Sequence, residues 1–122
     1  MRGYKIIQED GKWLFRLFPN NSNRLEVGSS KLFDSYNECF DGVQAFRKLI
    51  IENNINSIDS PFVTVLEFRD DGLRKALLEY RVDGEMIFQS RKYSSSSPIT
   101  LCKKSAKSIY EHINDYTLKQ VY

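Results

Sequence analysis

Two cysteines and one histidine are the side chains in this 122-residue chain with the most direct capacity for nucleophilic or metal chemistry. Cys39 and Cys102 lie at matching points of two predicted helices, where they could meet as a redox pair. The alternative is that both are small apolar core residues, because thiols with apolar neighbours tend to be buried and inert. We expect both cysteines to be buried core residues. Three such side chains are also too few for a zinc site built from Cys and His alone.

His112 could act as a general base only with an orienting partner and a nearby nucleophile. The alternative is a solvent-facing side chain, favourably placed at the C-terminal end of a helix. Neither a Gly-x-Ser-x-Gly motif nor the spacing of a phosphate-binding Walker loop occurs in the chain. The paired acids at residues 9–10 and 70–71 lack calcium-loop spacing and are typical of turns. We therefore expect no enzyme, and no catalytic, cofactor-binding or metal-ligating residues.

A run of basic residues without acids extends from Arg91 to Tyr110. One interpretation is a patch that binds RNA or DNA weakly, without sequence preference and with steep salt dependence. The alternative is an ordinary solvated helix face, since no aromatic RNA-binding strand accompanies it and the net charge of the chain is only +2. The candidate patch residues are Arg91, Lys92, Lys103, Lys104 and Lys107.

The composition is that of one compact globular domain, with 41% hydrophobic and 28% charged residues in 14.3 kDa. The longest apolar run, residues 49–51, is far shorter than the roughly 18 residues of a membrane span. The first residues contain no apolar signal core. We expect a cytoplasmic protein with no membrane association.

Two helices are predicted by one apolar stripe that occurs twice, with spacings of four, three and four residues. Each member of the second stripe lies 63 positions after its counterpart. The stripes are Cys39, Val43, Phe46 and Ile50, and Cys102, Ala106, Ile109 and Ile113. Ser35 with Glu38 has the form of a capping box, and Ser97 before Pro98 predicts the start of the second helix.

Three strands precede each helix, and a turn containing Asp-Gly joins the first two strands in both halves. The aromatic residues before the helices, Phe33 and Tyr93, are only 60 positions apart, which indicates a three-residue insertion in the serine stretch 94–97. In the strand at 12–18, alternation places Phe15 and Leu17 on one face. The predicted strands are 4–7, 12–18 and 25–30, and then 62–68, 74–82 and 86–90.

We therefore predict an α+β fold of two tandem β-β-β-α repeats, related by a pseudo-two-fold, with an antiparallel sheet packed against two helices. One repeat alone is too small to bury a satisfactory core. The single domain, 1–122, would contain repeat 1 (3–53), a connector (54–61), repeat 2 (62–115) and a C-terminal segment (116–122). That last segment fits either a short strand or a frayed helical tail.

Three motifs of the first half resemble the YegP-like family of uncharacterised proteins. They are the strand pattern at 11–17 (GKWLFRL), the aromatic-x-Ser at 33–35 (FDS) and the helix pattern at 39–46 (CFDGVQAF). The second half departs from the pattern, since Ser105 stands where the family has glycine. The resemblance implies the same strand-and-helix units, either as tandem repeats or as a dimer of single repeats, and it implies no activity or cofactor.

We expect a small non-enzymatic binding or interaction module, because edge strands and aromatic strand residues offer places for a partner. The partner would be an unknown protein or a second copy of the chain. The basic patch is the alternative. A third hypothesis is a small-ligand protein or enzyme with a cleft between the repeats. Polar groups of Trp13, Tyr36 or Tyr80 would then converge in that cleft.

Overall fold

The computed structural model describes residues 2–19 and 26–121. In chain order the elements are β1 (Gly3–Glu9), β2 (Lys12–Phe18), β3 (Gly28–Ser30), α1 (Tyr36–Glu52), β4 (Val63–Asp70), β5 (Leu73–Val82), β6 (Glu85–Ser90), β7 (Tyr93–Ser94), α2 (Pro98–His112), a 3-10 turn (Ile113–Asp115) and β8 (Thr117–Val121). The strands form one sheet in the order β4-β5-β6-β3-β2-β1-β8, and β7 pairs with β5 beside this path.

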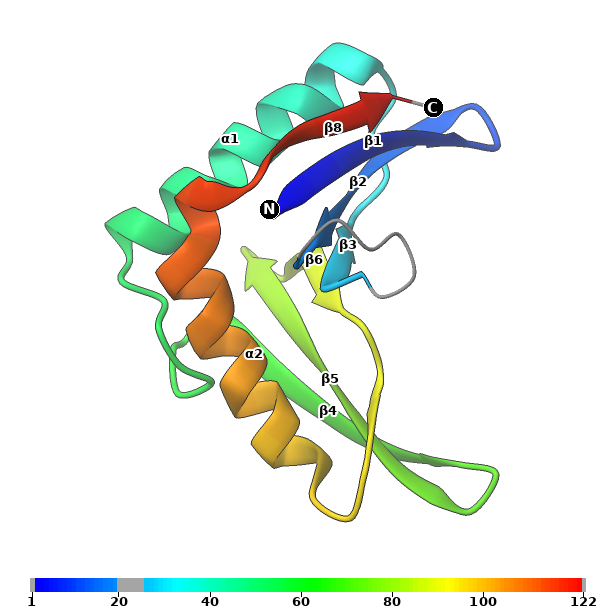
Figure 1. The fold of residues 1–122 in the computed structure, drawn as a ribbon, viewed down its shortest axis with the longest axis vertical. Helices are drawn as coiled ribbons and strands as arrows, with labels where there is room; N and C mark the ends of the chain where they lie inside the picture. Colours follow the sequence, from blue (N-terminus) through cyan, green and yellow to red (C-terminus); the bar gives the residue numbers. More distant parts are fainter. Residues whose placement is uncertain (1, 20–25, 122) are drawn as a thin grey trace.

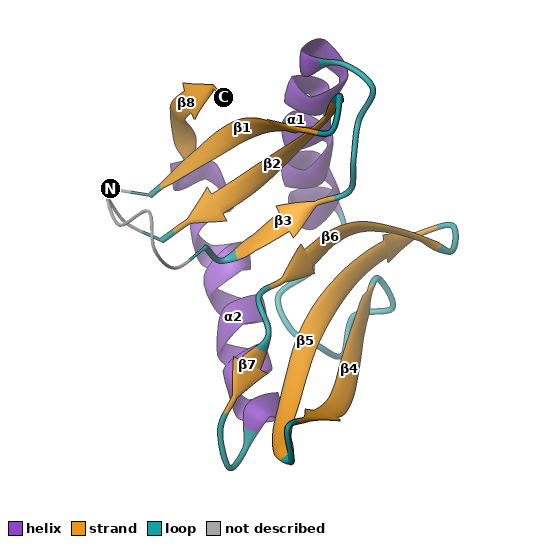
Figure 2. Cartoon of the chain, turned by 90° about the vertical axis from the view of Figure 1, so that its right-hand side faces the viewer, coloured by secondary structure: helices purple, strands orange, loops and turns teal. Residues whose placement is uncertain are grey.

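The predicted α+β class with a mostly antiparallel sheet is confirmed, and both helices pack against the same face of the sheet (Figures 1 and 2). The sheet bends, so that the β1–β2 and β4–β5 hairpins project to the same side, away from the helices (Figure 1). In the described chain, β8 is the strand that pairs in parallel, with β1 as its neighbour.

The Asp-Gly turns follow the sequence prediction. Asp10 and Gly11 between β1 and β2 have φ of 52° and 79°, and Asp71 and Gly72 repeat this geometry between β4 and β5. Two successive positive φ values match the twist of the flanking strands in a two-residue hairpin, and glycine adopts them without a Cβ penalty. The turn between β5 and β6 has the same form.

Both predicted helix stripes are buried, as expected from their spacing. Phe46 from α1 lies at the centre of an aromatic cluster, with its ring centroid 4.6 Å from Phe88, 5.3 Å from Tyr80 and 6.1 Å from Phe15. These rings come from α1, β2, β5 and β6. The core thus joins the two halves of the chain.

The structure differs from the expected boundaries in several places. β3 is shorter than the predicted strand 25–30, whose first residue lies outside the described residues, as do residues 20–23 of the expected turn. The pairing of Tyr93–Ser94 as β7 was not predicted. The C-terminal segment forms a strand, and the helical-tail alternative is wrong, because Tyr116 is buried and directs the chain alongside β1.

The two helix starts differ. Ser35 Oγ accepts a hydrogen bond from Glu38 N, as predicted, but the Glu38 carboxylate accepts from Asp34 N rather than from Ser35 N. Ser97 is the N-cap residue of α2, as predicted, but its side chain makes no capping hydrogen bond, because the hydroxyl bonds to Thr100 Oγ1 instead of a backbone N–H. Pro98 occupies the first turn of α2, where its missing N–H has no intrahelical role.

The two ends of the sheet are unlike each other. β8 covers β1, whereas β4 has β5 as its neighbour among the described strands. β4 carries Glu67, Arg69 and Asp70, and charges along an edge oppose pairing with another strand. Self-association through this edge stays a prediction. Neither helix in the described part of the chain is long and apolar enough to span a bilayer.

Candidate functional site

The seam between the two halves is the antiparallel pair β3–β6. Gly28 lies opposite Ser90, Ser29 opposite Gln89 and Ser30 opposite Phe88. The pairing continues symmetrically beyond the strands, with hydrogen bonds from Lys31 N to Ile87 O and from Arg91 N to Val27 O, both 3.0 Å long. The middle of this register is the Ser29–Gln89 pair, and each further contact on one side has a matching contact on the other.

Two buried serines bracket the seam in the same way. Ser30 Oγ accepts a hydrogen bond from Phe15 N at 2.9 Å and donates to Lys31 O at 2.7 Å. Ser90 Oγ accepts from Leu78 N at 2.8 Å and donates to Arg91 O at 2.9 Å. A buried hydroxyl with both bonds made fixes the strands it joins. No motif in the sequence pointed to a role for these serines.

An apolar pocket of about 610 Å³ lies where α1 meets the β5–β6 hairpin and the segment after β3. Its described lining comes from both halves of the chain, and Trp13, Tyr36 and Tyr80, the polar residues of the third hypothesis, are not among the lining residues. The described lining residues are Phe15, Lys31, Phe33, Gly42, Ala45, Phe46, Leu49, Val82, Asp83, Glu85 and Ile87. We call this site the apolar pocket.

Gly42 shapes the wall of the apolar pocket. A Cβ at this position would lie 2.4 Å from Cζ of Phe33, so only glycine allows that ring to lie against α1. Phe33 is held from the other side by backbone hydrogen bonds with Trp13, which place it next to β2. The Phe33 and Phe15 rings are stacked with centroids 6.5 Å apart. These contacts make an aromatic wall from residues that the family motif contains.

The rim of the apolar pocket is charged. Lys31 Nζ lies 2.7 Å from Glu85 Oε1 and 5.5 Å from the centroid of the Phe33 ring. Asp83 lies in the β5–β6 turn, with a φ of 51°. One ammonium group and two carboxylates therefore surround the opening, which gives the rim an excess of one negative charge.

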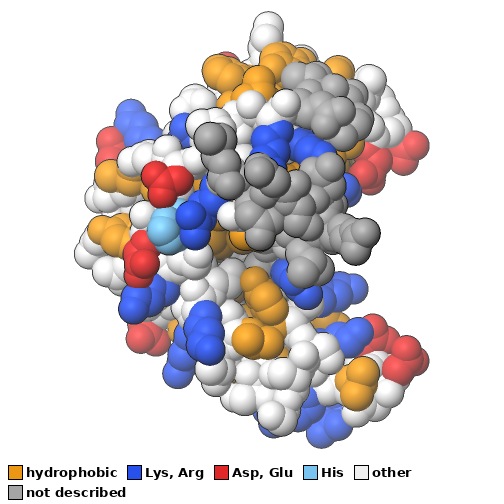
Figure 3. Space-filling view, in the orientation of Figure 1, with side chains coloured by type: hydrophobic (Ala, Val, Ile, Leu, Met, Phe, Trp, Pro, Cys, Tyr) orange, Lys and Arg blue, Asp and Glu red, His pale blue; other side chains and the backbone are white. Residues whose placement is uncertain are grey.

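The five cations of the predicted basic patch do not converge on one site. Lys103, Lys104 and Lys107 are exposed on α2, and Figure 3 shows blue side chains spread along this side of the molecule. Lys107 pairs with Glu111 at 3.8 Å, and the Lys92 ammonium lies 5.7 Å from the ring centroid of Phe68. This arrangement fits the alternative of a solvated helix face better than a continuous patch.

Arg91 and Lys104 do line a shared hollow. It has a volume of about 310 Å³ and lies between α2, the segment after β6 and the residues that flank 20–25. We call it the polar pocket after the charged side chains among its lining residues, although most of the surface that lines it is apolar. Its described lining residues are Pro19, Glu26, Val27, Arg91, Tyr93, Leu101, Lys104, Ser105 and Ser108.

Cys39 and Cys102 are fully buried free thiols, as the core interpretation predicted. Burial raises the pKa of Cys39 to about 12, and burial together with the Glu67 carboxylate raises the pKa of Cys102 to about 11. The reactive thiolate is therefore scarce at neutral pH. We expect neither thiol to react with Ellman's reagent at pH 8 in the folded protein, and both to react in denaturant. Rapid labelling of either cysteine in the native protein would contradict this assignment.

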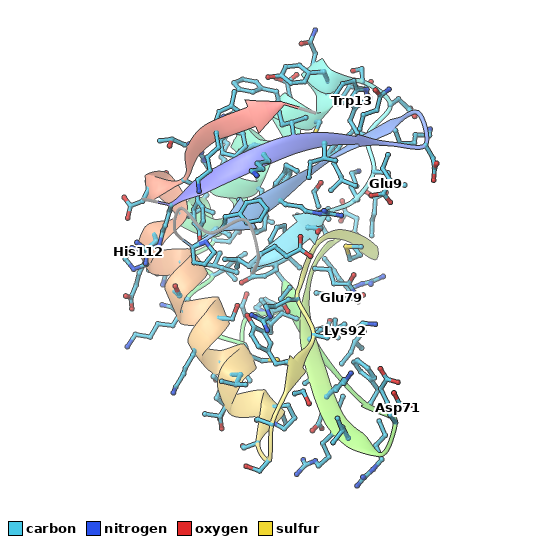
Figure 4. The ribbon with its side chains drawn as sticks, turned by 45° about the vertical axis from the view of Figure 1, so that its right-hand side comes forward. Glu9, Trp13, Asp71, Glu79, Lys92 and His112 are labelled. Carbon is cyan, nitrogen blue, oxygen red and sulfur yellow. The ribbon has the colours of Figure 1, made fainter. Side chains whose placement is uncertain are left out.

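The other candidate residues from the sequence do not line either pocket. His112 pairs through Nδ1 with Asp115 Oδ2 at 3.0 Å, at the end of α2, and Figure 4 shows it far from Trp13. Trp13 and Tyr36 form an edge-to-face pair with centroids 5.8 Å apart. Tyr80 is fully buried, and its hydroxyl makes no hydrogen bond. Within the described residues, no three Cys, His, Asp or Glu side chains are grouped to hold a metal ion.

Comparisons with known proteins identify the fold. No family model matches the chain, and no curated protein matches it. The solution structure of a UPF0339 protein from Shewanella oneidensis matches with a TM-score of 0.67 and 15% identity, over 98% of this chain and 90% of that one. The solution structure of the E. coli protein of unknown function YegP matches with a TM-score of 0.67 and 13% identity, over 98% and 91%. The predicted resemblance to YegP-like proteins is confirmed at the level of the fold.

Proposed function

We propose that this chain, which shares its fold with YegP-like proteins, is a non-enzymatic binding protein for a small amphiphilic molecule. The apolar body of the ligand would lie in the apolar pocket, and a cationic head would lie at the rim. The observation that carries this proposal is the pocket itself, with its volume of about 610 Å³ and its wall of three phenylalanine rings.

The size and lining of the apolar pocket support a ligand rather than a reaction. Small-molecule sites are typically concave, about 300–1,000 Å³ in volume, mostly apolar, and equipped with a few orienting polar groups. The charged side chains among the described lining residues are Lys31, Asp83 and Glu85, and Lys31 and Glu85 already form an ion pair. No nucleophile and base lie together in this lining, as acyl or phosphoryl transfer would require.

The charge at the rim supports a cationic head. Glu85 is partly neutralised by Lys31, whereas Asp83 forms no ion pair with the residues that the structure describes. An ammonium group at the opening would meet the excess carboxylate, and a carboxylate in the same place would be repelled. The expected order of affinity is therefore amine, then alcohol, then acid, on one common apolar body.

4-Phenylbutylamine is the probe for this prediction. We expect it to bind with a dissociation constant on the order of 1 mM in an NMR titration, with shifts at Ala45, Leu49 and Ile87. 4-Phenylbutanol should bind more weakly, and 4-phenylbutyrate most weakly. Ala45→Phe should abolish the shifts, because the added ring fills the pocket from α1.

The matched control is Ser108→Phe, which places the same ring on α2 at the position 63 residues later. Ser108 lines the polar pocket and not the apolar one, so this variant should bind the amine as the parent protein does. Equal binding by folded Ala45→Phe and by the parent would rule out the apolar pocket as the site. Shifts spread evenly over the surface would do the same.

We further propose that the chain is an internal duplication, with a pseudo-two-fold axis through the Ser29–Gln89 pair. The support is a set of matched contacts. The seam pairs Ser29 with its own counterpart Gln89, and it pairs Gly28 and Ser30 with each other's counterparts, Ser90 and Phe88. Ser30 and Ser90 bond to equivalent backbone groups, and the pair Trp13–Phe33 corresponds to Ala76–Tyr93. The two pockets correspond as well, with Phe33 and Gly42 in one matching Tyr93 and Ser105 in the other.

A further inference from the structure

The polar pocket differs from the apolar pocket in the sign of the charge among its lining residues. The described residues that line it contribute two cations, Arg91 and Lys104, and one acid, Glu26. The Glu26 carboxylate is already 3.0 Å from Nε of Arg16, which directs its charge away from a ligand. No ion pair joins Arg91 or Lys104 to an acid among the residues that the structure describes. The pocket therefore has a positive excess.

A buried hydroxyl in this pocket has the side chain of Tyr93 as its neighbour. Ser105 is 8% exposed and lies on the pocket-facing side of α2, and its Oγ interacts with the Tyr93 side chain but bonds to no backbone group. A hydroxyl has one donor and two acceptor sites, so Ser105 can accept from Tyr93 and still donate to an oxygen of a ligand.

Tyr93 forms the aromatic wall beside this hydroxyl. The Arg91 guanidinium lies over its ring, 5.4 Å from the centroid. Burial raises the pKa of Tyr93, and its hydrogen bond with Ser105 and the charge of Arg91 oppose that rise only in part. The phenol is therefore neutral at pH 7. The planar N–H groups of the Arg91 guanidinium match the geometry of an oxyanion.

We propose that the polar pocket binds an oxyanion, phosphate or carboxylate, carried on a small aromatic body. Arg91 and Lys104 supply the charge, Ser105 Oγ donates a hydrogen bond, and the aromatic body packs against Leu101 and Tyr93. The pocket volume of about 310 Å³ suits a ligand of one ring and one anionic group. This site is separate from the apolar pocket and does not depend on the ligand proposed there.

Phenyl phosphate titrated into the isotope-labelled full chain tests this site. We expect saturable amide shifts at residues 91–93 and 104–108. Benzoate and inorganic phosphate distinguish the two oxyanions and the contribution of the ring. Stronger binding of phenyl phosphate than of benzoate assigns a phosphate ligand, and the reverse order assigns a carboxylate. The proposal is overturned if none of the three anions binds.

Charge-matched variants separate a pocket from a diffuse basic surface. Lys104→Gln and Arg91→Gln should each weaken binding by roughly tenfold. Lys103→Gln and Lys107→Gln remove the same charge from the same region outside the pocket and should weaken binding less than about twofold. Equal losses in all four variants would contradict the pocket and assign the binding to the helix surface.

Ser105→Ala tests the buried hydroxyl itself. We expect it to weaken phenyl phosphate binding about fivefold or more with little change in the unfolding temperature, because the Ser105 hydroxyl makes no hydrogen bond to the backbone. A purely structural role for Ser105 would give the opposite pattern, with a lower unfolding temperature and unchanged affinity. Because Arg91 also belongs to the seam, the unfolding curve of Arg91→Gln is measured together with its titration. If Arg91→Gln does not fold, the loss of phenyl phosphate affinity in Lys104→Gln tests the proposal.

Discussion

Phe46→Ala is expected to lower the free energy of unfolding by about 3–5 kcal/mol. Its ring is 3% exposed and touches aromatic rings from β2, β5 and β6, so the deletion leaves a cavity where the two halves meet. Rigid surrounding strands cannot collapse into that space, and the lost contacts are not replaced. Urea unfolding followed by circular dichroism measures the change.

Phe40→Ala is the control for the aromatic core. Phe40 lies on the same helix and is 37% exposed, so removal of its ring should cost less than about 1 kcal/mol. Comparable losses in the two variants would show that α1 is not anchored through Phe46. A loss of cooperativity in Phe46→Ala, with one half unfolding first, would contradict a shared core.

Ser30→Ala and Ser90→Ala are expected to destabilise the protein by similar amounts, about 1–3 kcal/mol each. Each substitution leaves a buried backbone N–H, of Phe15 or of Leu78, without its acceptor. The costs should add in the double variant because the two hydrogen bonds share no partner. Denaturant unfolding of the two single variants and the double variant gives all three values.

Ser29→Ala is the control for the serine pair, because Ser29 lies between the two halves at the seam but forms no side-chain hydrogen bond of this kind. We expect a change within about 0.5 kcal/mol. A large cost at Ser30 with none at Ser90 would contradict the duplication, since the proposal assigns equal roles to the two hydroxyls.

The helices and tight turns could be predicted because their signals are local. The apolar stripe through Cys39 and Val43 has the helical period, and a stripe with that period buries one face wherever it packs. The turns at Asp10-Gly11 and Asp71-Gly72 depend on these residue pairs alone, because a two-residue hairpin requires a positive φ at both positions. These features hold in any tertiary setting.

The sheet order and the last strand could not be predicted, because they depend on contacts between distant segments. Thr117–Val121 pairs in parallel with β1, and alternation alone did not distinguish this strand from a helical tail. Tyr93–Ser94 forms β7 because it pairs with Lys75 and Ala76 of β5. The sequence around residues 93–94 is short and polar, so its local pattern does not predict a strand. Ser97 is the N-cap residue of α2 as its position predicts, but its hydroxyl bonds to Thr100 Oγ1 rather than to a backbone N–H.

The candidate sites were only partly visible in the sequence. Arg91 and Lys104 were identified as basic residues, but their shared pocket depends on how α2 lies across the strand ends. Phe33 and Gly42 are part of the family motif, but the motif alone does not say why these residue types are required. The close contact between the Phe33 ring and the backbone of Gly42 explains why they occur together. Ser105 departs from the family motif at the position of Gly42. In the structure this serine places a buried hydroxyl beside Tyr93, where Gly42 has no side chain.

We propose that the two halves of the fold carry, at corresponding places, two pockets whose lining charges have opposite sign. Titration of both probes into two pocket-filling variants tests it most directly. We predict that Ala45→Phe loses 4-phenylbutylamine and keeps phenyl phosphate, and that Ser108→Phe loses phenyl phosphate and keeps the amine. Loss of both probes in either correctly folded variant, or retention of both in each, would contradict two separate pockets.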